Sequence, residues 1–184
     1  EMVRAELKPL GFDVQWIDMR ATGRAGHLVA THVGNGRGKR VLMIGHLDTV
    51  FEPDSPFQRF VRNGDSATGP GIGDDKGGVV IIVSALRAMH AAGTLRDAAI
   101  KVVLTGDEES AGTPLEAARA DLVAAGKWAD VALEYEELIV RDGRDYATVA
   151  RRGVTDWELT TTGITGHSGG VFGDALGYGA NYEL

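Results

Sequence analysis

Three apolar, strand-like segments of this sequence run directly into histidine or carboxylate side chains. Residues 41–49 read Val-Leu-Met-Ile-Gly-His-Leu-Asp-Thr, so His46 and Asp48 follow an apolar run at once. Residues 100–109 and 131–137 end in the same way, in Asp-Glu-Glu and in Glu-Glu. Ligands of open α/β sheets bind beyond the carboxyl ends of the strands. The three endings therefore predict one acidic, histidine-bearing site at a single edge of a sheet.

The apolar segments alternate with segments of helical periodicity. In chain order we expect a helix up to Gly11, strands at 13–17, 27–33 and 40–44, a helix at 77–92, a strand at 100–105, a helix from about 113 to 126 and a strand from residue 131. Strand–helix–strand order with apolar strands is typical of a covered sheet. The fold class that we predict is α/β, a mainly parallel sheet with helices on both of its faces.

Local signals mark the boundaries of several of these elements. The glycines of residues 34–38 indicate a turn with positive φ between two strands. Gly93 is placed to end the helix that precedes it. Thr113, Pro114 and Glu116 form the pattern of a capping box, in which the threonine side chain would cap the next helix.

The pattern of apolar residues and the glycine content change after about residue 150. Residues 147–150 and 154–162 alternate polar and apolar side chains with period two, as strands with one solvated face do. Residues 163–179 contain seven glycines. We therefore predict a first domain in residues 1–150 and the beginning of a second, smaller domain in residues 151–184.

Both ends of the sequence lack boundary signals. The first ten residues already have a helical pattern, and residues 181–184 carry no helix-ending signal. We therefore expect this chain to be a piece of a longer protein.

Composition excludes several classes of function. The 26 acidic and 19 basic residues give a net charge of −7, whereas a nucleic-acid partner requires a basic face. No apolar run approaches the ~20 residues that cross a bilayer, so we expect no membrane partner. Without cysteine, disulfides, thiolate metal sites and cysteine nucleophiles are excluded. Composition leaves the compartment open, and a soluble protein of the cytoplasm, the periplasm or the cell exterior fits equally.

His46 and Asp48 lie two residues apart at a predicted strand end. Such a pair is, by itself, more often structural than functional. In a metal site, His46 would bind the ion through one ring nitrogen, and Asp48 would orient the imidazole or a neighbouring ligand. The other histidines of this region, His27, His32 and His90, have no acidic neighbour pattern and are interpreted as structural.

Asp74 and Asp75 lie in a glycine-dense loop, residues 69–78, that enters a predicted helix. The loop lacks the Gly-x4-Gly-Lys-Ser/Thr pattern of phosphate-binding loops, and two aspartates would repel a phosphate. A nucleotide-binding α/β domain is therefore disfavoured. An acidic helix N-terminus is the plain alternative, whereas beside His46 a carboxylate of this loop could bridge two cations.

Asp107, Glu108 and Glu109 are three adjacent carboxylates that follow a predicted strand. Runs of this kind are common on solvated loops. Directly after an apolar strand, however, their mutual repulsion is costly unless a cation neutralises it. Adjacent glutamates point apart, so one can bind metal while the other faces a bound water. After the third strand the candidates are Glu136 and, as solvated alternatives, Glu134 and Glu137.

Four of these motifs together resemble the di-zinc peptidases and deacylases. The sequence contains Gly-His-Leu-Asp-Thr-Val at 45–50, Gly-Asp-Asp-Lys-Gly-Gly at 73–78, Asp-Glu-Glu at 107–109 and Gly-His-Ser at 166–168. The group includes glutamate carboxypeptidase, acetylornithine deacetylase, succinyl-diaminopimelate desuccinylase and aminoacylase. The glycine-dense loop and the segment 129–136 look most like the glutamate carboxypeptidase branch.

The resemblance implies two zinc ions, and cobalt or manganese is compatible with the same ligands. It assigns one zinc to His46, Asp74 and Glu136. Asp74 would also bridge to a second zinc, held by Glu109. The last histidine ligand of the family's second zinc has no counterpart in these 184 residues, so we expect the second site to be incomplete in this chain.

The resemblance also implies three catalytic roles. Glu108 would be the general base, and Asp48 would be the partner of the histidine ligand. Residues 1–150 would be the N-terminal part of the catalytic domain, and residues 151–184 would begin an α+β lid through which the protein forms a homodimer. His167 would reach from that lid towards an active site and stabilise the oxyanion.

These expectations define a zinc-dependent hydrolase that cleaves an amide or peptide bond, similar to glutamate carboxypeptidase and acting on a small peptide. A deacylase acting on an N-acyl amino acid would use the same residues and is the alternative. A non-catalytic binding domain with this fold is the alternative from a different class. The free carboxylate of Glu108 argues against it, because a binding module has no use for one beside a ligand.

Overall fold

The computed structural model describes residues 1–153 and 155–180. Contacts divide the chain into two compact units, Glu1–Tyr146 and Ala147–Leu184. Val154, in one of the predicted strands, and the chain end at 181–184 lie outside the described residues. Within the described ranges, every helix is too short or too polar to cross a lipid bilayer.

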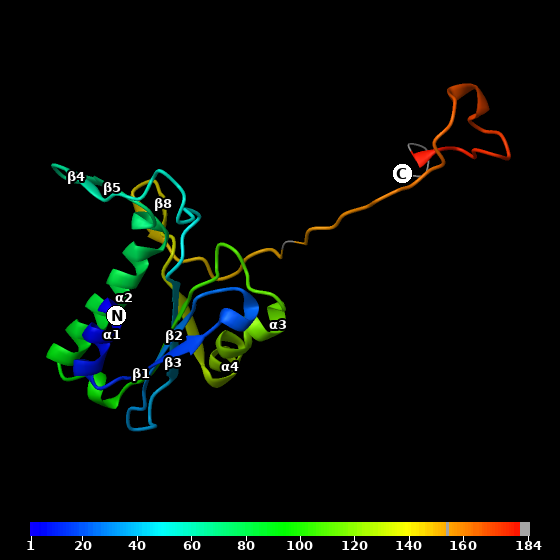
Figure 1. The fold of residues 1–184 in the computed structure, drawn as a ribbon. Helices are drawn as coiled ribbons and strands as arrows, with labels where there is room; N and C mark the ends of the chain where they lie inside the picture. Colours follow the sequence, from blue (N-terminus) through cyan, green and yellow to red (C-terminus); the bar gives the residue numbers. More distant parts are fainter. Residues whose placement is uncertain (154, 181–184) are drawn as a thin grey trace. The chain divides into compact units, whose positions relative to one another are not determined.

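The first unit is built around a five-stranded sheet (Figure 1). In spatial order its strands are β1 (Asp13–Asp18), β2 (Gly26–His32), β6 (Ala99–Thr105), β3 (Arg40–His46) and β7 (Val131–Glu134). β2 pairs antiparallel with both β1 and β6, whereas β3 pairs parallel with both β6 and β7. The predicted α/β class is confirmed, but the sheet is mixed: two of its four strand pairings are parallel, so it is less parallel than predicted.

The lengths of the connections explain the mixed sheet. A parallel crossover needs a dozen or more residues. The connections at residues 19–25 and 33–39 are shorter, so both reverse the direction of the chain. Only the long connections from β3 to β6 and from β6 to β7 contain α-helices, and these give parallel strands.

The turn at 34–38 has the predicted positive φ angles, but the two strands that it connects are not adjacent in the sheet. Gly34 and Gly36 have φ of 64° and 73°. However, β6 lies between the two strands that this turn connects. The turn crosses the end of β6 closely, and a Cβ on Gly34 would stand 2.5 Å from the carbonyl carbon of Ala98.

Helices cover both faces of the sheet, as predicted (Figure 1). One face carries α1 (Met2–Leu7) and α2 (Gly78–Ala91), and the other carries α3 (Leu115–Ala118) and α4 (Ala120–Trp128). Shorter helical turns lie at Lys8–Leu10, Arg20–Thr22, Ile72–Gly77 and Leu95–Asp97.

Alternation along the strands divides the core into two clusters. On β3, Leu42 packs with Val103 and with Ala125 of α4. The next residue, Met43, points to the opposite face and belongs to the cluster that contains Ile82 of α2. The period of two in a strand places consecutive side chains on opposite faces, so both faces are buried.

Gly93 ends α2 as predicted, with φ of 73°. Its N–H donates to the carbonyl of His90 at 3.0 Å, and the N–H of Thr94 donates to that of Met89 at 3.0 Å. These two bonds form a Schellman motif, in which a left-handed residue follows the helix.

We expect Gly93→Ala to lower the free energy of unfolding by about 1 kcal/mol, because a Cβ is disfavoured at positive φ. Gly126→Ala is the matched control. Gly126 lies inside α4, and no atom lies within 4 Å of the point where a Cβ would stand, so alanine should raise stability by roughly 0.5–1 kcal/mol. Urea unfolding followed by circular dichroism measures both. Equal effects of the two substitutions would contradict the role of backbone conformation at Gly93.

The predicted capping box at 113–116 is wrong. The N-cap of α3 is Pro114, and no side chain caps this helix. The backbone N–H of Thr113 instead donates to the carbonyl of Thr22 at 3.0 Å, which ties the residue to a different segment. The helix also breaks at Arg119, and α4 continues to Trp128 rather than stopping near Gly126.

Two exposed hairpins were not predicted. They consist of β4 (Val61–Asn63) with β5 (Ser66–Thr68), and of β8 (Ile139–Arg141) with β9 (Arg144–Tyr146). The two-residue turns are Gly64-Asp65 and Asp142-Gly143, both hairpin-turn dipeptides, and Gly64, Asp142 and Gly143 have positive φ. These turn dipeptides were the sequence feature from which the two hairpins could have been predicted.

The second unit has little regular structure. The described residues of the segments 147–150 and 154–162 form no strand, contrary to the prediction. An alternating pattern favours a strand only when a partner strand supplies hydrogen bonds, and no described residue pairs with these segments. The unit contains a helical turn at Ser168–Gly170 and a β-bridge between Gly173 and Gly177.

Candidate metal centre

The carboxyl ends of three parallel strands meet at one edge of the sheet. His46 at the end of β3 is in register with Thr105 at the end of β6, and Ile44 is in register with Glu134 of β7. The acidic segments that follow β6 and β7 therefore begin beside His46. This confirms the predicted convergence of the three strand endings.

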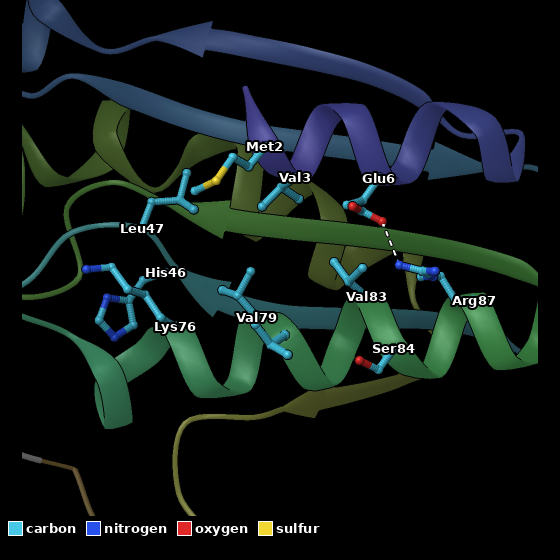
Figure 2. Close-up of a pocket in the computed structure, with 11 residues that line it drawn as sticks. Met2, Val3, Glu6, His46, Leu47, Lys76, Val79, Val83, Ser84 and Arg87 are labelled. Carbon is cyan, nitrogen blue, oxygen red and sulfur yellow. Dashed lines mark hydrogen bonds and ion pairs between the residues drawn. The ribbon is translucent and has the colours of Figure 1, made fainter. Parts of the chain in front are cut away.

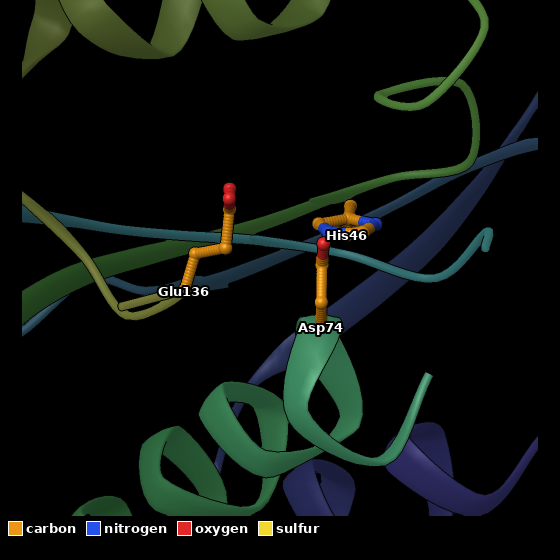
Figure 3. Close-up of side chains that lie close together, drawn as sticks. All are labelled: His46, Asp74 and Glu136. Atoms are coloured by element: carbon orange, nitrogen blue, oxygen red, sulfur yellow. Dashed lines mark hydrogen bonds and ion pairs between the residues drawn. The ribbon is translucent and has the colours of Figure 1, made fainter. Parts of the chain in front are cut away.

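His46, Asp74 and Glu136 form a cluster of possible metal donors (Figure 3). One ligand atom from each residue lies within 4.8 Å of the others. Nε2 of His46 is 2.6 Å from Oδ1 of Asp74. His46 is buried, Glu136 is half-buried and Asp74 is exposed, so the cluster is open to solvent on one side.

This donor set fits a divalent transition metal. One imidazole and two carboxylates suit Zn²⁺, Co²⁺ or Mn²⁺. Around a tetrahedral zinc with ligand distances of ~2.0–2.2 Å, donor atoms lie ~3.3–3.6 Å apart. The donor atoms here lie within 4.8 Å of one another, so side-chain movements of about 1 Å would bring the three donors around one ion.

The electrostatics of the cluster also favour a cation. Burial raises the pKa of Glu136, and the negative charges of Asp74, Glu108 and Glu134 raise it further. Burial lowers the pKa of His46, but its hydrogen bond to Asp74 and the nearby carboxylates together outweigh that effect, so the net change is upward. A bound cation would relieve the repulsion that raises the pKa of Glu136, and on His46 it would replace the proton that the carboxylates favour.

Asp48 connects the histidine to the acidic loop after β6. Its Oδ1 lies 3.3 Å from Nδ1 of His46, a buried nitrogen without a hydrogen-bond partner. The two carboxylate oxygens of Asp48 also accept the backbone N–H groups of Glu108 at 3.2 Å and Glu109 at 3.0 Å. Asp48 therefore lies beside the imidazole and is hydrogen-bonded to the loop, whereas its role as the partner of a metal-bound histidine stays a prediction.

Glu109 and Glu108 lie beside the cluster but outside it. Glu109 and Asp74 line the same cavity of about 290 Å³. Burial raises the pKa of Glu109, and the charges of Asp74 and Glu108 raise it further. The roles of Glu109 as a ligand of a second zinc and of Glu108 as a base stay predictions.

A larger cavity of about 730 Å³ opens between α1 and α2 (Figure 2). His46 and Lys76 stand at one end, and the ion pair between Glu6 and Arg87, 3.2 Å, stands at the other. Its walls are mostly apolar, and neither Asp74 nor any glutamate of the cluster lines it. Of the three cluster residues, His46 lines this cavity and Asp74 lines the smaller one, whereas Glu136 lines neither.

A buried polar network holds the loop that carries the glutamates. The N–H of Gly106 donates to Nδ1 of His27 at 3.0 Å, so Nε2 of His27 carries the proton and donates to the carbonyl of Ala118 at 2.9 Å. Asp107 is fully buried, accepts the N–H of Gly112 at 2.9 Å and pairs with the guanidinium of Arg119. His27 is structural, as the sequence indicated.

Sequence reasoning did not identify the roles of three charged residues. In the sequence, Asp107 is noticeable only as part of an acidic run. No motif or spacing in the sequence indicates that Arg119 pairs with it. Asp75 stands there only as the neighbour of Asp74, yet it is 1% exposed and accepts the backbone N–H of His46 at 3.0 Å. Burial raises its pKa. Charged side chains are rarely buried, so the sequence offers no reason to expect these positions.

His167 belongs to the second unit. Its ring Nδ1 accepts the N–H of Gly169 at 3.0 Å, within its own glycine-rich turn, and the residue is exposed. Its contribution to an active site stays a prediction.

The chain is similar to known peptidases and deacylases. The sequence profile of peptidase family M20/M25/M40 matches residues 42–169. Carboxypeptidase G2 from Pseudomonas sp. (strain RS-16) is 30% identical over 171 residues, which cover 91% of this chain and 39% of that protein. Succinyl-diaminopimelate desuccinylase from Halorhodospira halophila (strain DSM 244 / SL1) is 33% identical over 178 residues, 90% of this chain and 44% of that protein.

Solved structures show the same fold. The crystal structure of human carnosine dipeptidase 1 matches with a TM-score of 0.57 and 21% identity, over 73% of this chain and 31% of that one. This chain thus spans less than half the length of the curated relatives and of the solved structure that it matches. Because the family profile covers more than half of the sequence, the chain belongs to peptidase family M20/M25/M40.

Proposed function

We propose that this chain forms the metal-binding part of a zinc-dependent hydrolase that cleaves amide bonds in small peptides, similar to glutamate carboxypeptidase. The observation that carries the proposal is the convergence of His46, Asp74 and Glu136 to within 4.8 Å at the carboxyl edge of the sheet. Their donor atoms match the ligands of catalytic zinc. The acidic loop with Glu108 lies beside them, anchored by Asp48.

Each residue of the site has a distinct task in this proposal. His46, Asp74 and Glu136 would hold one zinc, and Asp74 with Glu109 would hold the second. When bound, the metal pair would supply Lewis acidity, which lowers the pKa of a water and polarises a carbonyl group. Glu108 takes the proton from the attacking water and delivers it to the leaving amine.

A deacylase that acts on N-acyl amino acids is the second candidate. Carboxypeptidase G2 and the succinyl-diaminopimelate desuccinylases are similarly distant from this chain, at 30% and 28–33% identity. Identity therefore does not separate a peptide from an N-acyl amino acid as the substrate. In either case we propose that the second unit acts as a lid, that it mediates homodimerisation, and that His167 stabilises the oxyanion.

Metal binding tests the proposal on the chain itself. We expect a Co²⁺ titration, followed by visible absorption, to show one tight site, and we expect His46→Gln to weaken it by about 100-fold or more. His90→Gln, on the exposed face of α2, is the matched control and should bind as the parent does. Zinc at 100 times its dissociation constant should also stabilise the parent by about 2.7 kcal/mol. A parent that binds no metal, or a His46→Gln variant that binds as well as the parent, rules out this centre.

A hydrolysis panel distinguishes the two candidate reactions. The zinc-loaded protein that carries this sequence is assayed with peptides or folates ending in glutamate, and with N-acetyl and N-succinyl amino acids. Preferred cleavage of the glutamate-terminated substrates supports the carboxypeptidase. Preferred cleavage of the acyl amino acids supports the deacylase, and binding of zinc without hydrolysis of either class favours a non-catalytic domain.

A further inference from the structure

Asp75 is a buried carboxyl group to which neither the proposed ligand set nor the proposed base assigns a role. The residue is 1% exposed. Its Oδ2 accepts the backbone N–H of His46 at 3.0 Å, whereas its Oδ1 is buried without a hydrogen-bond partner. Burying a polar atom in this way is costly, so a structural benefit must offset the cost.

This carboxyl group lies against the supports of all three donor residues. It accepts from the backbone of His46, and its residue follows Asp74 directly in the chain. Its Oδ1 and the carbonyl oxygen of Tyr135, the residue before Glu136, both crowd the point where a Cβ on Gly78 would stand. One buried group therefore contacts or adjoins the three segments that deliver the donors.

Two glycines provide the space that the carboxyl group occupies. A Cβ on Gly45 would stand 2.5 Å from Oδ2 of Asp75. A Cβ on Gly78 would stand 2.5 Å from the carbonyl oxygen of Tyr135, and closer still to Oδ1 of Asp75. Neither glycine has positive φ, so the requirement at both positions is for space and not for an unusual backbone.

We propose that Asp75 is a positioning residue, whose carboxyl group sets the spacing between the end of β3, the loop before α2 and the segment after β7. In this way it holds the three donors at metal-binding distance. The inference rests on the proposed function, because the donors matter only if they bind metal. Asp75 itself does not touch the ion.

A positioning role depends on the shape of the side chain and not on its charge. An asparagine oxygen can accept the same N–H of His46, and the asparagine NH₂ would take the place of Oδ1, beside the Gly78 position that the carbonyl oxygen of Tyr135 also borders. Asp75→Asn should therefore preserve the spacing. Asp75→Ala removes the acceptor and leaves a gap, so the donors should separate.

Two measurements test the proposal. The first is the affinity for Co²⁺, which we expect to stay within about threefold in Asp75→Asn and to fall by about 10–100-fold in Asp75→Ala, as for other groups that orient ligands. The second is the exchange rate of the His46 amide hydrogen in the metal-free chain, measured by NMR. It should rise by at least about tenfold in Asp75→Ala alone, because only this variant lacks an acceptor for that N–H.

Gly45→Ala supports the test without removing the carboxyl group. Its Cβ would push Oδ2 away from the His46 amide, so Co²⁺ affinity should fall and amide exchange should accelerate. This variant decides the question if Asp75→Ala does not fold, and Gly126→Ala is its control for an added methyl group.

The proposal is overturned if Asp75→Ala, or in its place Gly45→Ala, behaves as the parent. It is equally overturned if Asp75→Asn is as weak as Asp75→Ala. A parent that binds no Co²⁺ rules out the proposed function instead, and the amide exchange then decides the positioning role alone.

Discussion

Replacing Arg119 by methionine is expected to lower the free energy of unfolding by about 3 kcal/mol, the low end of the cost of breaking one half of a buried ion pair. Asp107 is fully buried, and the guanidinium of Arg119 is its only charged partner within hydrogen-bonding distance among the described residues. Methionine fills similar space but leaves the carboxylate unpaired. The Arg119 side chain is 24% exposed, which is why we take the low end of the range. Urea unfolding followed by circular dichroism measures the change.

The control for this substitution is Arg96→Met. Arg96 pairs with Asp97 at 3.3 Å, but both side chains are largely exposed, at 83% and 51%. Solvent screens such a pair, so its loss should not change the urea midpoint measurably. If Arg119→Met and Arg96→Met unfold at the same urea concentration, the buried pair does not stabilise the acidic loop in the way we infer.

The Arg119 pair also has a consequence for the site. Its guanidinium donates to the backbone carbonyl of Asp107 at 3.0 Å, directly before Glu108 and Glu109. The loop is therefore held from one side by Arg119 and from the other by Asp48, whose oxygens accept the N–H groups of both glutamates. Loss of the Arg119 contact should loosen the glutamates even where the chain still folds.

The convergence of the site could be predicted from the sequence because it follows from a local property. An apolar run predicts a buried strand, and parallel strands end at a common edge. His46 and the residues after β6 and β7 were therefore expected together, and His46 and Glu136 indeed share one cluster. Asp74 joins them through a loop, and here the resemblance to a family, not strand geometry, supplied the prediction.

The sheet topology could be predicted only in part. The short connections at 19–25 and 33–39 require antiparallel directions, and attention to their length would have predicted a mixed sheet. The insertion of β6 between β2 and β3 has no such signal. It depends on pairing between residues far apart in the chain, which the pattern of any single segment does not record.

The buried charges could not be predicted at all. Asp75 and Asp107 are buried and Arg119 is half-buried, although all three residue types are typical of solvated loops. Their burial depends on partners such as the backbone N–H of His46. Interactions of this kind connect segments distant in the sequence. The same holds for the glycines at 45 and 78, whose need for space exists only after Asp75 has packed against them.

Glu108→Gln is expected to lower kcat by roughly 10³-fold, within the range for removal of a general base, while Co²⁺ affinity stays within about twofold. Glutamine has the shape of glutamate but cannot accept and return a proton. The side chain lies outside the cluster of His46, Asp74 and Glu136, so the donors should be undisturbed. Glu116→Gln, which replaces an exposed glutamate in α3, is the matched control and should keep full activity.

Two measurements are made on each variant: steady-state hydrolysis by the zinc-loaded protein that carries this sequence, and Co²⁺ titration. Retained turnover in Glu108→Gln would assign proton transfer to another group, whereas parallel losses of turnover and metal affinity would make Glu108 a ligand instead of a base.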